Sequence, residues 1–308
     1  MSNNLTVSVS SKQRALFAAV RKAELEIVRA LTEAGVSVNF SLPSQPGHIA
    51  ITPLMLACFK GYSEMVRYLL DHGAIVEATD ELDNTALYYA VRSNQNVAID
   101  GIVSCLLEHG ADPNHKIRAN WGNVFVASIR KGQAQTIQRL LAAGAKVNSE
   151  SENMTSPLIE AANVGDDNIT SLLLANGANV NYRGIGGRTA LMTAADNGFV
   201  RVVELLIEWN ADPNASDENG STALTLAANR VGDCFDETEG QRYLEVIKLL
   251  VKSGVHMNVL APNGWTPLDL AEYNPRKSHE YFGPRWFGKG AEYLIKVGAR
   301  RASELPST

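Results

Sequence analysis

The fold of this chain is decided by the stretch Gly187–Asp217, which reads GRTALMTAADNGFVRVVELLIEWNADPNASD. Two sets of apolar residues in it have helical spacing, the first after Thr189 and the second around Val202–Leu206. Gly198 separates the two sets, and the turn-forming residues of 211–214 close the stretch. Each predicted helix is too short to be stable alone in water. The stretch therefore predicts neighbours of the same kind.

Copies of this stretch recur before and after it. Thr189 has equivalents at Thr52, Thr85, Asn123, Ser156, Thr222 and Thr266. In chain order these landmarks lie 33, 38, 33, 33, 33 and 44 residues apart, so the base period is 33 residues. A second landmark, a Gly-Ala-like pair, begins at Gly73, Gly110, Gly144, Gly177, Asn210, Gly254 and Gly298. Two landmarks at a fixed period indicate a repeat architecture.

The motifs at the first landmark are TPLMLA (52–57), TALYYA (85–90), SPLIEAA (156–162), TALMTAA (189–195), TALTLAA (222–228) and TPLDLA (266–271). The second landmark reads GADPN, GAKVN, GANVN or NADPN in the clearest copies. In both motifs the chain resembles the ankyrin repeat family. The resemblance implies an all-α repeat solenoid, built from ankyrin-type helix-turn-helix units with β-hairpin-like finger loops.

The landmarks predict about eight units, including the two terminal caps. A flexible N-terminus (1–10) precedes the array (11–302), and a frayed tail (303–308) follows it. The predicted units are about 11–45, 46–78, 79–117, 118–150, 151–183, 184–216, 217–260 and 261–302.

Each landmark has a physical role. Thr or Ser can cap the first helix of a unit, and Gly stops the second helix where a positive φ is needed. An Asn follows six of the stops by four residues, and its side chain can hydrogen-bond turn backbone. These residues are Asn39, Asn114, Asn148, Asn181, Asn214 and Asn258.

One residue type common in the family is missing. The family often has His three residues after the Thr, where it ties the turn together. Here those positions hold Met55, Tyr88, Val126, Ile159, Met192, Thr225 and Asp269. The hydrogen-bond network of that His is therefore absent or replaced. We expect lower stability than an idealised array, with a thermal midpoint below about 90 °C.

Several units depart from the base length. The first finger (35–52) is long, and unit three gains residues around 94–100. Unit seven contains the acidic insert GDCFDETEGQ (232–241), which is typical of a solvated loop rather than a calcium site. Unit eight contains the basic, aromatic insert NPRKSHEYFGPRWFGKG (274–290). This insert either folds back over the last helices as a lid or contacts a partner.

Composition limits the cellular setting. The net charge of −5 argues against nucleic-acid binding, which needs clustered Lys and Arg. No apolar run is long enough to span a membrane, and the first residues lack the features of a signal peptide. We therefore predict a cytoplasmic protein, with secretion by a route independent of a signal peptide left open. The widely spaced Cys58, Cys105 and Cys234 fit reduced thiols.

The sequence offers little catalytic chemistry. Cys105, His109 and His115 superficially suggest a metal site. However, His72 and His109 share one register before a terminating Gly, where a cation favours a helix end, so a structural role is favoured. Phosphate-binding, metalloprotease and hydrolase motifs are all missing. We predict a protein that is not an enzyme, with no cofactor and no metal.

The remaining prediction is a recognition surface. The resemblance implies that the chain binds a protein partner through a concave face of fingers and first helices, as a monomer, possibly inhibiting or sequestering that partner. An alternative is a microbial effector or adaptor that scaffolds a host protein, and an enzyme is a distant third. The candidate partner-binding residues are Phe59, Lys60, Asn84, Tyr88, Arg92, Trp121, Arg130, Arg188, Asp196, Asn229, Arg230, Trp265, Tyr281 and Trp286. For Trp121 and Trp265 the alternative to partner contact is packing between adjacent fingers.

Overall fold

A computed structural model of the chain describes residues 9–43, 49–94, 99–117, 123–149, 155–233, 237–272 and 289–306. In these residues the structure is helical apart from one short hairpin and an isolated bridge. The chain divides into two compact parts, the N-terminal half (Met1–Lys146) and the C-terminal half (Val147–Thr308). Each half is a solenoid of helix-turn-helix units, as the repeat pattern predicts.

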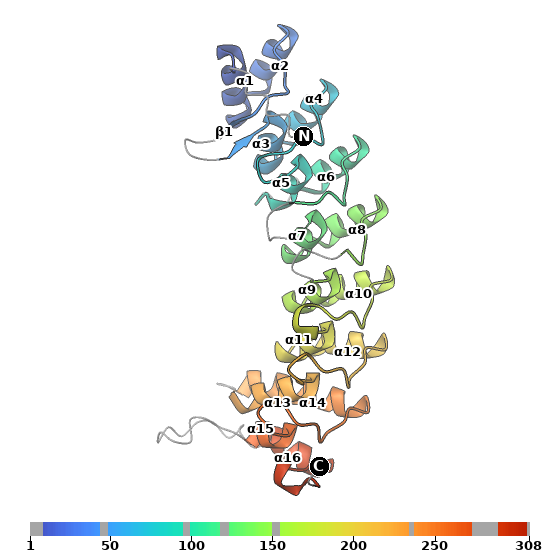
Figure 1. Cartoon of the computed structure of the whole chain (residues 1–308). Coiled ribbons are helices and arrows are strands. Elements are labelled where there is room, and N and C mark those ends of the chain that lie inside the picture. Colours follow the sequence, from blue (N-terminus) through green and yellow to red (C-terminus); the bar gives the residue numbers. More distant parts are fainter. Residues whose placement is uncertain are drawn as a thin grey trace, which may run out of the picture. The chain divides into compact units, whose positions relative to one another are not determined.

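In the N-terminal half, the first helices of the pairs lie along one side and the second helices along the other (Figure 1). The first helices are α1 (Ser11–Arg21), α3 (Pro53–Lys60), α5 (Ala86–Arg92) and α7 (Val124–Arg130). The second helices are α2 (Leu25–Glu33), α4 (Ser63–Asp71), α6 (Ile99–Glu108) and α8 (Ala134–Ala142).

The C-terminal half repeats the arrangement (Figure 1). Its first helices are α9 (Pro157–Val164), α11 (Ala190–Asp196), α13 (Ala223–Asp233) and α15 (Pro267–Glu272). Its second helices are α10 (Asp167–Ala175), α12 (Val200–Glu208), α14 (Glu237–Lys252) and α16 (Lys289–Lys296). Two 3-10 turns, η1 (Ile185–Gly187) and η2 (Ala302–Glu304), complete it.

Most landmark residues cap a first helix, as predicted. The hydroxyl of Thr52 accepts a hydrogen bond from the Met55 N–H at 3.2 Å. Ser156, Thr189 and Asn123 make the equivalent bond to the residue three positions on. Thr85 is the exception, because its buried hydroxyl makes no capping bond.

Two units replace the missing His with an oxygen acceptor. Thr225 Oγ1 accepts a hydrogen bond from the Thr222 N–H at 2.8 Å. In the last unit, Asp269 Oδ2 accepts from both the N–H and the hydroxyl of Thr266, each at 2.9 Å. Both replacements close the start of the first helix in the way that a capping box does.

The Asn residues after each stop join successive units. Asn181 donates from Nδ2 to the carbonyl of Asn210 at 3.2 Å and accepts from the Asp212 N–H at 2.7 Å. Asn39, Asn114 and Asn148 make the same pair of bonds to the turn of the next unit. The predicted turn bonds therefore exist, but their partner turn belongs to the following repeat.

The long first finger contains an antiparallel hairpin. β1 (Leu42–Pro43) pairs with β2 (Ala50–Ile51), with Leu42 opposite Ile51. The middle of this finger, 44–48, lies outside the described residues.

The insert of unit seven differs from its prediction. We expected a solvated loop over 232–241, but α13 continues to Asp233 and α14 begins at Glu237. Residues 234–236 between the helices are not described. The insert thus lengthens both helices, and α14 places Tyr243 in the interior, 6% exposed. Inserted residues that continue a helical pattern can bury apolar side chains, which a loop would leave in water.

Side-chain contacts hold the described residues next to both chain ends. Ser10 caps α1 in a reciprocal bond with Gln13, whereas residues 1–8 lie outside the description. At the other end, Arg301 forms a bidentate pair with Glu272, with distances of 2.6 and 2.9 Å. The turn η2 follows at once, so the segment just before and inside the predicted tail is held against α15.

Candidate functional site

The exposed ends of the first helices form the candidate surface. In α3 the first six residues are buried, whereas Phe59 and Lys60 are exposed, Phe59 by 41%. Arg92 ends α5 and Arg130 ends α7, and both are exposed. The structure thus places these four predicted residues at equivalent positions of three successive helices.

Phe59 rests on a tyrosine of the next unit. Its ring meets the ring of Tyr89 edge to face, with centroids 6.2 Å apart. The Tyr89 hydroxyl donates to Oδ2 of Asp80 at 2.7 Å. Burial and the bond to Asp80 both raise the pKa of Tyr89 above its ordinary range. Tyr89 therefore stays protonated and donates to Asp80. This bond holds the Tyr89 ring in place against Phe59.

Asp80 organises the finger before α5. Its Oδ1 accepts from the N–H groups of Leu82 and Asn84 at 2.8 and 2.9 Å. Its Oδ2 also accepts from the side-chain amide of Asn84 at 2.8 Å. Four donors compensate the burial of this carboxylate, which is 8% exposed. Asp217 holds the finger before α13 similarly, accepting from the N–H groups of Asn219 and Ser221.

Two predicted contact residues are buried in the structure. Asn84 is 6% exposed because Asp80 draws it inward, and Tyr88 is 3% exposed because its side of α5 faces the stack. Neither side chain offers surface to a partner. Their neighbours Asp80 and Tyr89, which sequence reasoning missed, support the finger and the exposed Phe59 ring. An Asp five residues before the landmark Thr in two fingers, Asp80 before Thr85 and Asp217 before Thr222, was a signal that could have found Asp80.

Two cations at the helix ends are oriented by neutral groups. The Arg92 guanidinium lies 5.6 Å from the Tyr88 ring centre and donates to the Tyr88 hydroxyl at 3.3 Å. Lys131, just after α7, donates to the Asn94 side chain at 3.0 Å and the Arg92 carbonyl at 3.4 Å. These contacts tie α5 to α7 and leave the positive charges in place.

In the C-terminal half, one carboxylate gathers two predicted arginines. Asp196 at the end of α11 accepts from Arg188 at 2.7 Å and from Arg230 of α13 at 2.8 Å. Burial raises the pKa of Asp196, but the hydrogen bonds from Arg230 and Arg188 outweigh it and hold that pKa below its usual range. Tyr243 donates to the Asp196 carbonyl at 3.0 Å. Asn229, beside Arg230, is exposed.

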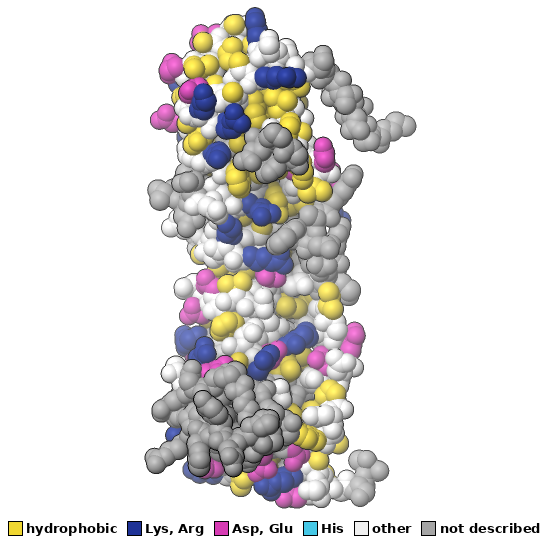
Figure 2. Space-filling model, turned by 90° about the vertical axis from the view of Figure 1, so that its left-hand side faces the viewer, with side chains coloured by type: hydrophobic (Ala, Val, Ile, Leu, Met, Phe, Trp, Pro, Cys, Tyr) yellow, Lys and Arg dark blue, Asp and Glu magenta, His cyan; other side chains and the backbone are white. Residues whose placement is uncertain are grey.

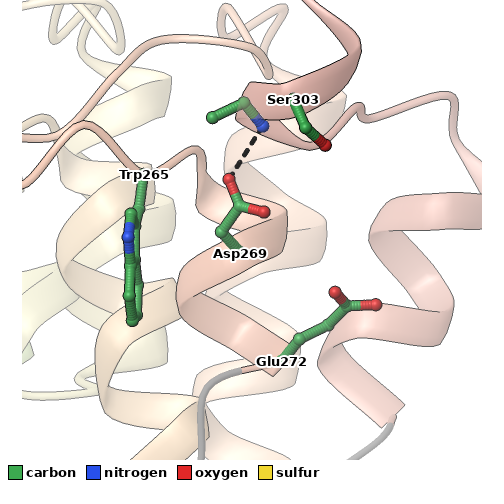
Figure 3. A pocket seen from close by; sticks show the side chains of 5 residues that line it. Trp265, Asp269, Glu272 and Ser303 are labelled. Atoms are coloured by element: carbon green, nitrogen blue, oxygen red, sulfur yellow. Dashed lines mark hydrogen bonds between the residues drawn. The ribbon is translucent and has the colours of Figure 1, made fainter.

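Trp265 lies at the edge of a pocket of about 400 Å³ at the end of the last unit. Asp269, Glu272, Ala302 and Ser303 line the rest (Figure 3). Both carboxylates hold the C-terminal segment, since Asp269 accepts from the Ala302 N–H at 2.9 Å and Glu272 binds Arg301. The pocket is thus a product of terminal packing. Trp121, Tyr281 and Trp286 lie outside the described residues.

The histidines have structural contacts. His72 and His109 each bond through Nδ1 to the carbonyl four residues before, at 2.8 Å, as their shared register predicts. His115 contacts the Asp83 carbonyl at 3.0 Å. In the described part of the chain, no His, Cys, Asp or Glu side chains form a group of three or more that could hold a metal ion. Cys58 and Cys105 are buried free thiols, and burial raises the pKa of each, whereas Cys234 is not described.

Among the described helices, none combines the length and the apolar character that crossing a membrane requires.

A family model for ankyrin repeats matches residues 16–117, 124–217 and 186–237. The ankyrin repeat protein FPV031 of fowlpox virus is 31% identical over 162 residues, which cover 51% of this chain and 46% of that protein. The poly(ADP-ribose) polymerase tankyrase of Caenorhabditis elegans is 40% identical over 75 residues, which cover 24% of this chain and 3% of that protein. The matched region is thus less than half the length of these relatives.

Solved structures agree with the family match. The ankyrin repeat domain of Bcl-3, a member of the IkappaB protein family, superposes with a TM-score of 0.61 at 24% identity, covering 77% of this chain and 97% of that one. The human ASB11 ankyrin repeat domain gives a TM-score of 0.64 at 23% identity, covering 84% of this chain and 100% of that one. At these identities the likeness shows the fold alone.

Proposed function

This chain belongs to the ankyrin repeat family, and from that premise we propose that it recognises a protein partner through its fingers and first-helix ends. Ankyrin repeat domains are generally protein-interaction modules and typically non-catalytic. In this proposal, binding covers part of the partner's surface and thereby sequesters or inhibits it. The fold supplies the mode of recognition, while the exposed side chains select the partner.

The observation that carries the proposal is the end of α3. This helix buries its first six residues and exposes Phe59, a large apolar side chain with no packing role on its outer side. The edge contact with Tyr89 holds its ring in one place. Aromatic side chains that are exposed and already positioned are typical hot spots, because little conformational entropy is lost on binding.

The arginines around Asp196 support the same surface in the C-terminal half. The guanidiniums of Arg188 and Arg230 share the Asp196 carboxylate. The side chains of Arg188 and Arg230 are 37% and 49% exposed. Both can therefore donate to a partner's carboxylate while Asp196 holds them in place. Arg92, Arg130, Asn229 and Trp265 remain proposed contact residues.

The test begins with affinity capture by the full chain from its native cells, followed by titration of each purified candidate. We expect Phe59→Ala to weaken binding at least tenfold, since loss of a hot spot costs about 2 kcal/mol or more. Matched controls are Arg67→Ala and Arg139→Ala, which change exposed residues of the second helices α4 and α8. These should change affinity by less than about twofold.

The outcomes separate the proposals. If Phe59→Ala, Arg188→Ala and Arg230→Ala all bind as the natural chain does, the first-helix surface is not the binding site. If binding is lost as expected, an assay of the captured protein's own activity with and without this chain distinguishes an inhibitor from a scaffold.

A further inference from the structure

The first helices of the N-terminal half contain no acidic residue. Their sequences are SKQRALFAAVR, PLMLACFK, ALYYAVR and VFVASIR, which hold six Lys or Arg residues and no Asp or Glu. Each of these four helices has a basic residue in its last turn. We call these residues and the two cations that follow α1 and α7 the basic row: Arg21, Lys22, Lys60, Arg92, Arg130 and Lys131.

The second helices of the same units have the opposite character. α2, α4, α6 and α8 together hold six Asp or Glu and three Arg residues, a balance of −3 against +6 for the first helices. The fold does not require this separation, because every first helix of the C-terminal half contains a carboxylate. The charge of the basic row is therefore a property of this half alone.

The members of the basic row lie side by side. Phe59 meets Tyr89 across α3 and α5, and Lys131 donates to the Arg92 carbonyl across α5 and α7. α1 also packs on α3. Figure 2 faces the side on which these helices lie, and dark blue Lys and Arg side chains recur down its upper half. Every member of the basic row is exposed.

The spacing suits an extended acidic segment. Packed helices lie about 8–10 Å apart, and an extended chain advances about 3.3 Å per residue, so roughly three residues span one repeat. The same spacing is close to the Debye length of about 8 Å at physiological salt, so neighbouring cations add to one another's attraction. Among the described residues, Lys22 of the row already pairs with Glu24 at 4.0 Å, so the proposed contact centres on Lys60 and Lys131. Asp80 is buried in its four hydrogen bonds, and Glu81 and Asp83 follow it in the finger.

We propose that the basic row binds an Asp- or Glu-rich segment of the protein partner, in extended form, with an apolar side chain of that segment seated on Phe59. This inference rests on the proposed function and names the chemistry of the partner. A protein is favoured over a nucleic acid for two reasons. The exposed Phe59 ring lies within the row, where an apolar side chain of a peptide can rest on it. The acidic second helices and the net charge of −5 repel a polymer charged at every residue more strongly than a segment with an acidic group at every third residue.

The test measures fluorescence anisotropy with a labelled peptide that carries Glu at every third residue and one central Leu. The full chain is compared with the double variant Lys60→Glu, Lys131→Glu. The matched control is Arg67→Glu, Arg139→Glu, which changes the net charge equally on the second helices. Far-ultraviolet circular dichroism checks that each variant folds. If the Lys60→Glu, Lys131→Glu variant does not fold, a Lys60→Gln, Lys131→Gln variant replaces it.

We expect the row variant to bind the peptide at least tenfold more weakly and the control variant less than threefold more weakly. Raising the ionic strength from about 0.01 M to about 0.15 M should weaken the natural chain's binding, because the Debye length falls from about 30 Å to about 8 Å. A peptide with Gln in place of Glu should not bind.

Four results would overturn the inference. Equal losses in both double variants would mean that only the total charge matters. Undiminished binding of the Gln peptide would remove the acidic preference. Single-stranded DNA that binds more tightly than the peptide and depends on the row would make it a nucleic-acid surface. If a captured partner no longer binds the Phe59→Ala chain but still binds the row variant, this inference fails and the proposed function stands.

Discussion

Arg230 of α13 donates from Nε to Oδ1 of Asp196 in α11, one repeat earlier, at 2.8 Å. Arg188 of the preceding finger donates to Oδ2 of the same carboxylate at 2.7 Å. One side chain thus joins a finger and two first helices. Because only the ionised carboxylate can accept from two guanidiniums in this way, this junction depends on the charge of Asp196.

The junction predicts a pH dependence of stability. The pKa of Asp196 is lower in the folded chain than in the unfolded chain. Its stabilising effect is therefore complete above the ordinary Asp pKa of 3.8 and is lost as pH falls through the folded value. We expect the free energy of unfolding of the natural chain to fall relative to that of Asp196→Asn as the pH decreases below about 4. Urea unfolding at each pH measures this difference.

The control for this titration is Glu208→Gln, which removes an exposed carboxylate at the end of α12. Its stability should follow that of the natural chain over the same pH range. An Asp196→Asn protein that loses stability in acid as steeply as the natural chain would show that Asp196 does not carry the effect.

The asparagine bridge between repeats gives a second prediction. Asn181→Ala removes two hydrogen bonds to the next turn, and we expect the free energy of unfolding to fall by about 1–2 kcal/mol. Hydrogen exchange at the Asp212 amide, which Asn181 accepts from, should accelerate. Asn176→Ala is the control, since Asn176 bonds to Leu172 within one helix. Equal losses in both variants would mean that the link between repeats adds nothing.

The landmark threonines give a third prediction, because one of them does not cap. The Thr85 hydroxyl is buried without a hydrogen-bond partner, so Thr85→Val should leave stability unchanged or raise it by up to about 1 kcal/mol. Thr189 bonds to the Met192 N–H, so Thr189→Val should lose about 1 kcal/mol. Denaturant midpoints of the two variants compare them directly. If Thr85→Val lowers the free energy of unfolding as much as Thr189→Val does, the Thr85 hydroxyl must make a bond that the structure does not contain.

The repeat pattern predicted the fold because its two landmarks act locally. A threonine caps the helix that directly follows it. A residue with a positive φ, such as Gly73 at 78° or Asn210 at 62°, ends the helix that directly precedes it. Inserts are different, since length alone does not say whether added residues extend a helix or form a loop. That is why the helical insert of α13 and α14 was predicted as a loop.

The candidate surface was predicted less completely than the fold. Tyr88 and Tyr89 are adjacent, and which one faces the stack depends on a rotation of about 100° per residue and on the neighbouring helix. Asn84 is drawn inward by Asp80, a contact that a motif does not reveal. The basic row was readable in the sequence, but only by comparing the charges of the same position across successive units.

The contact between α13 and α16 gives the last prediction. A Cβ atom added to Gly290 would lie 2.8 Å from Cγ1 and 3.2 Å from Cγ2 of Val231, which is itself buried. Gly290→Ala should therefore lower the free energy of unfolding by about 1–3 kcal/mol through overpacking. Gly101 in α6 is the matched control, because it also lies near the start of a helix and an added Cβ would meet nothing within 4 Å. Gly101→Ala should gain about 0.5–1 kcal/mol from helix propensity. Urea unfolding of the two variants should thus move in opposite directions, and a gain at Gly290 would mean that α16 does not approach α13 this closely.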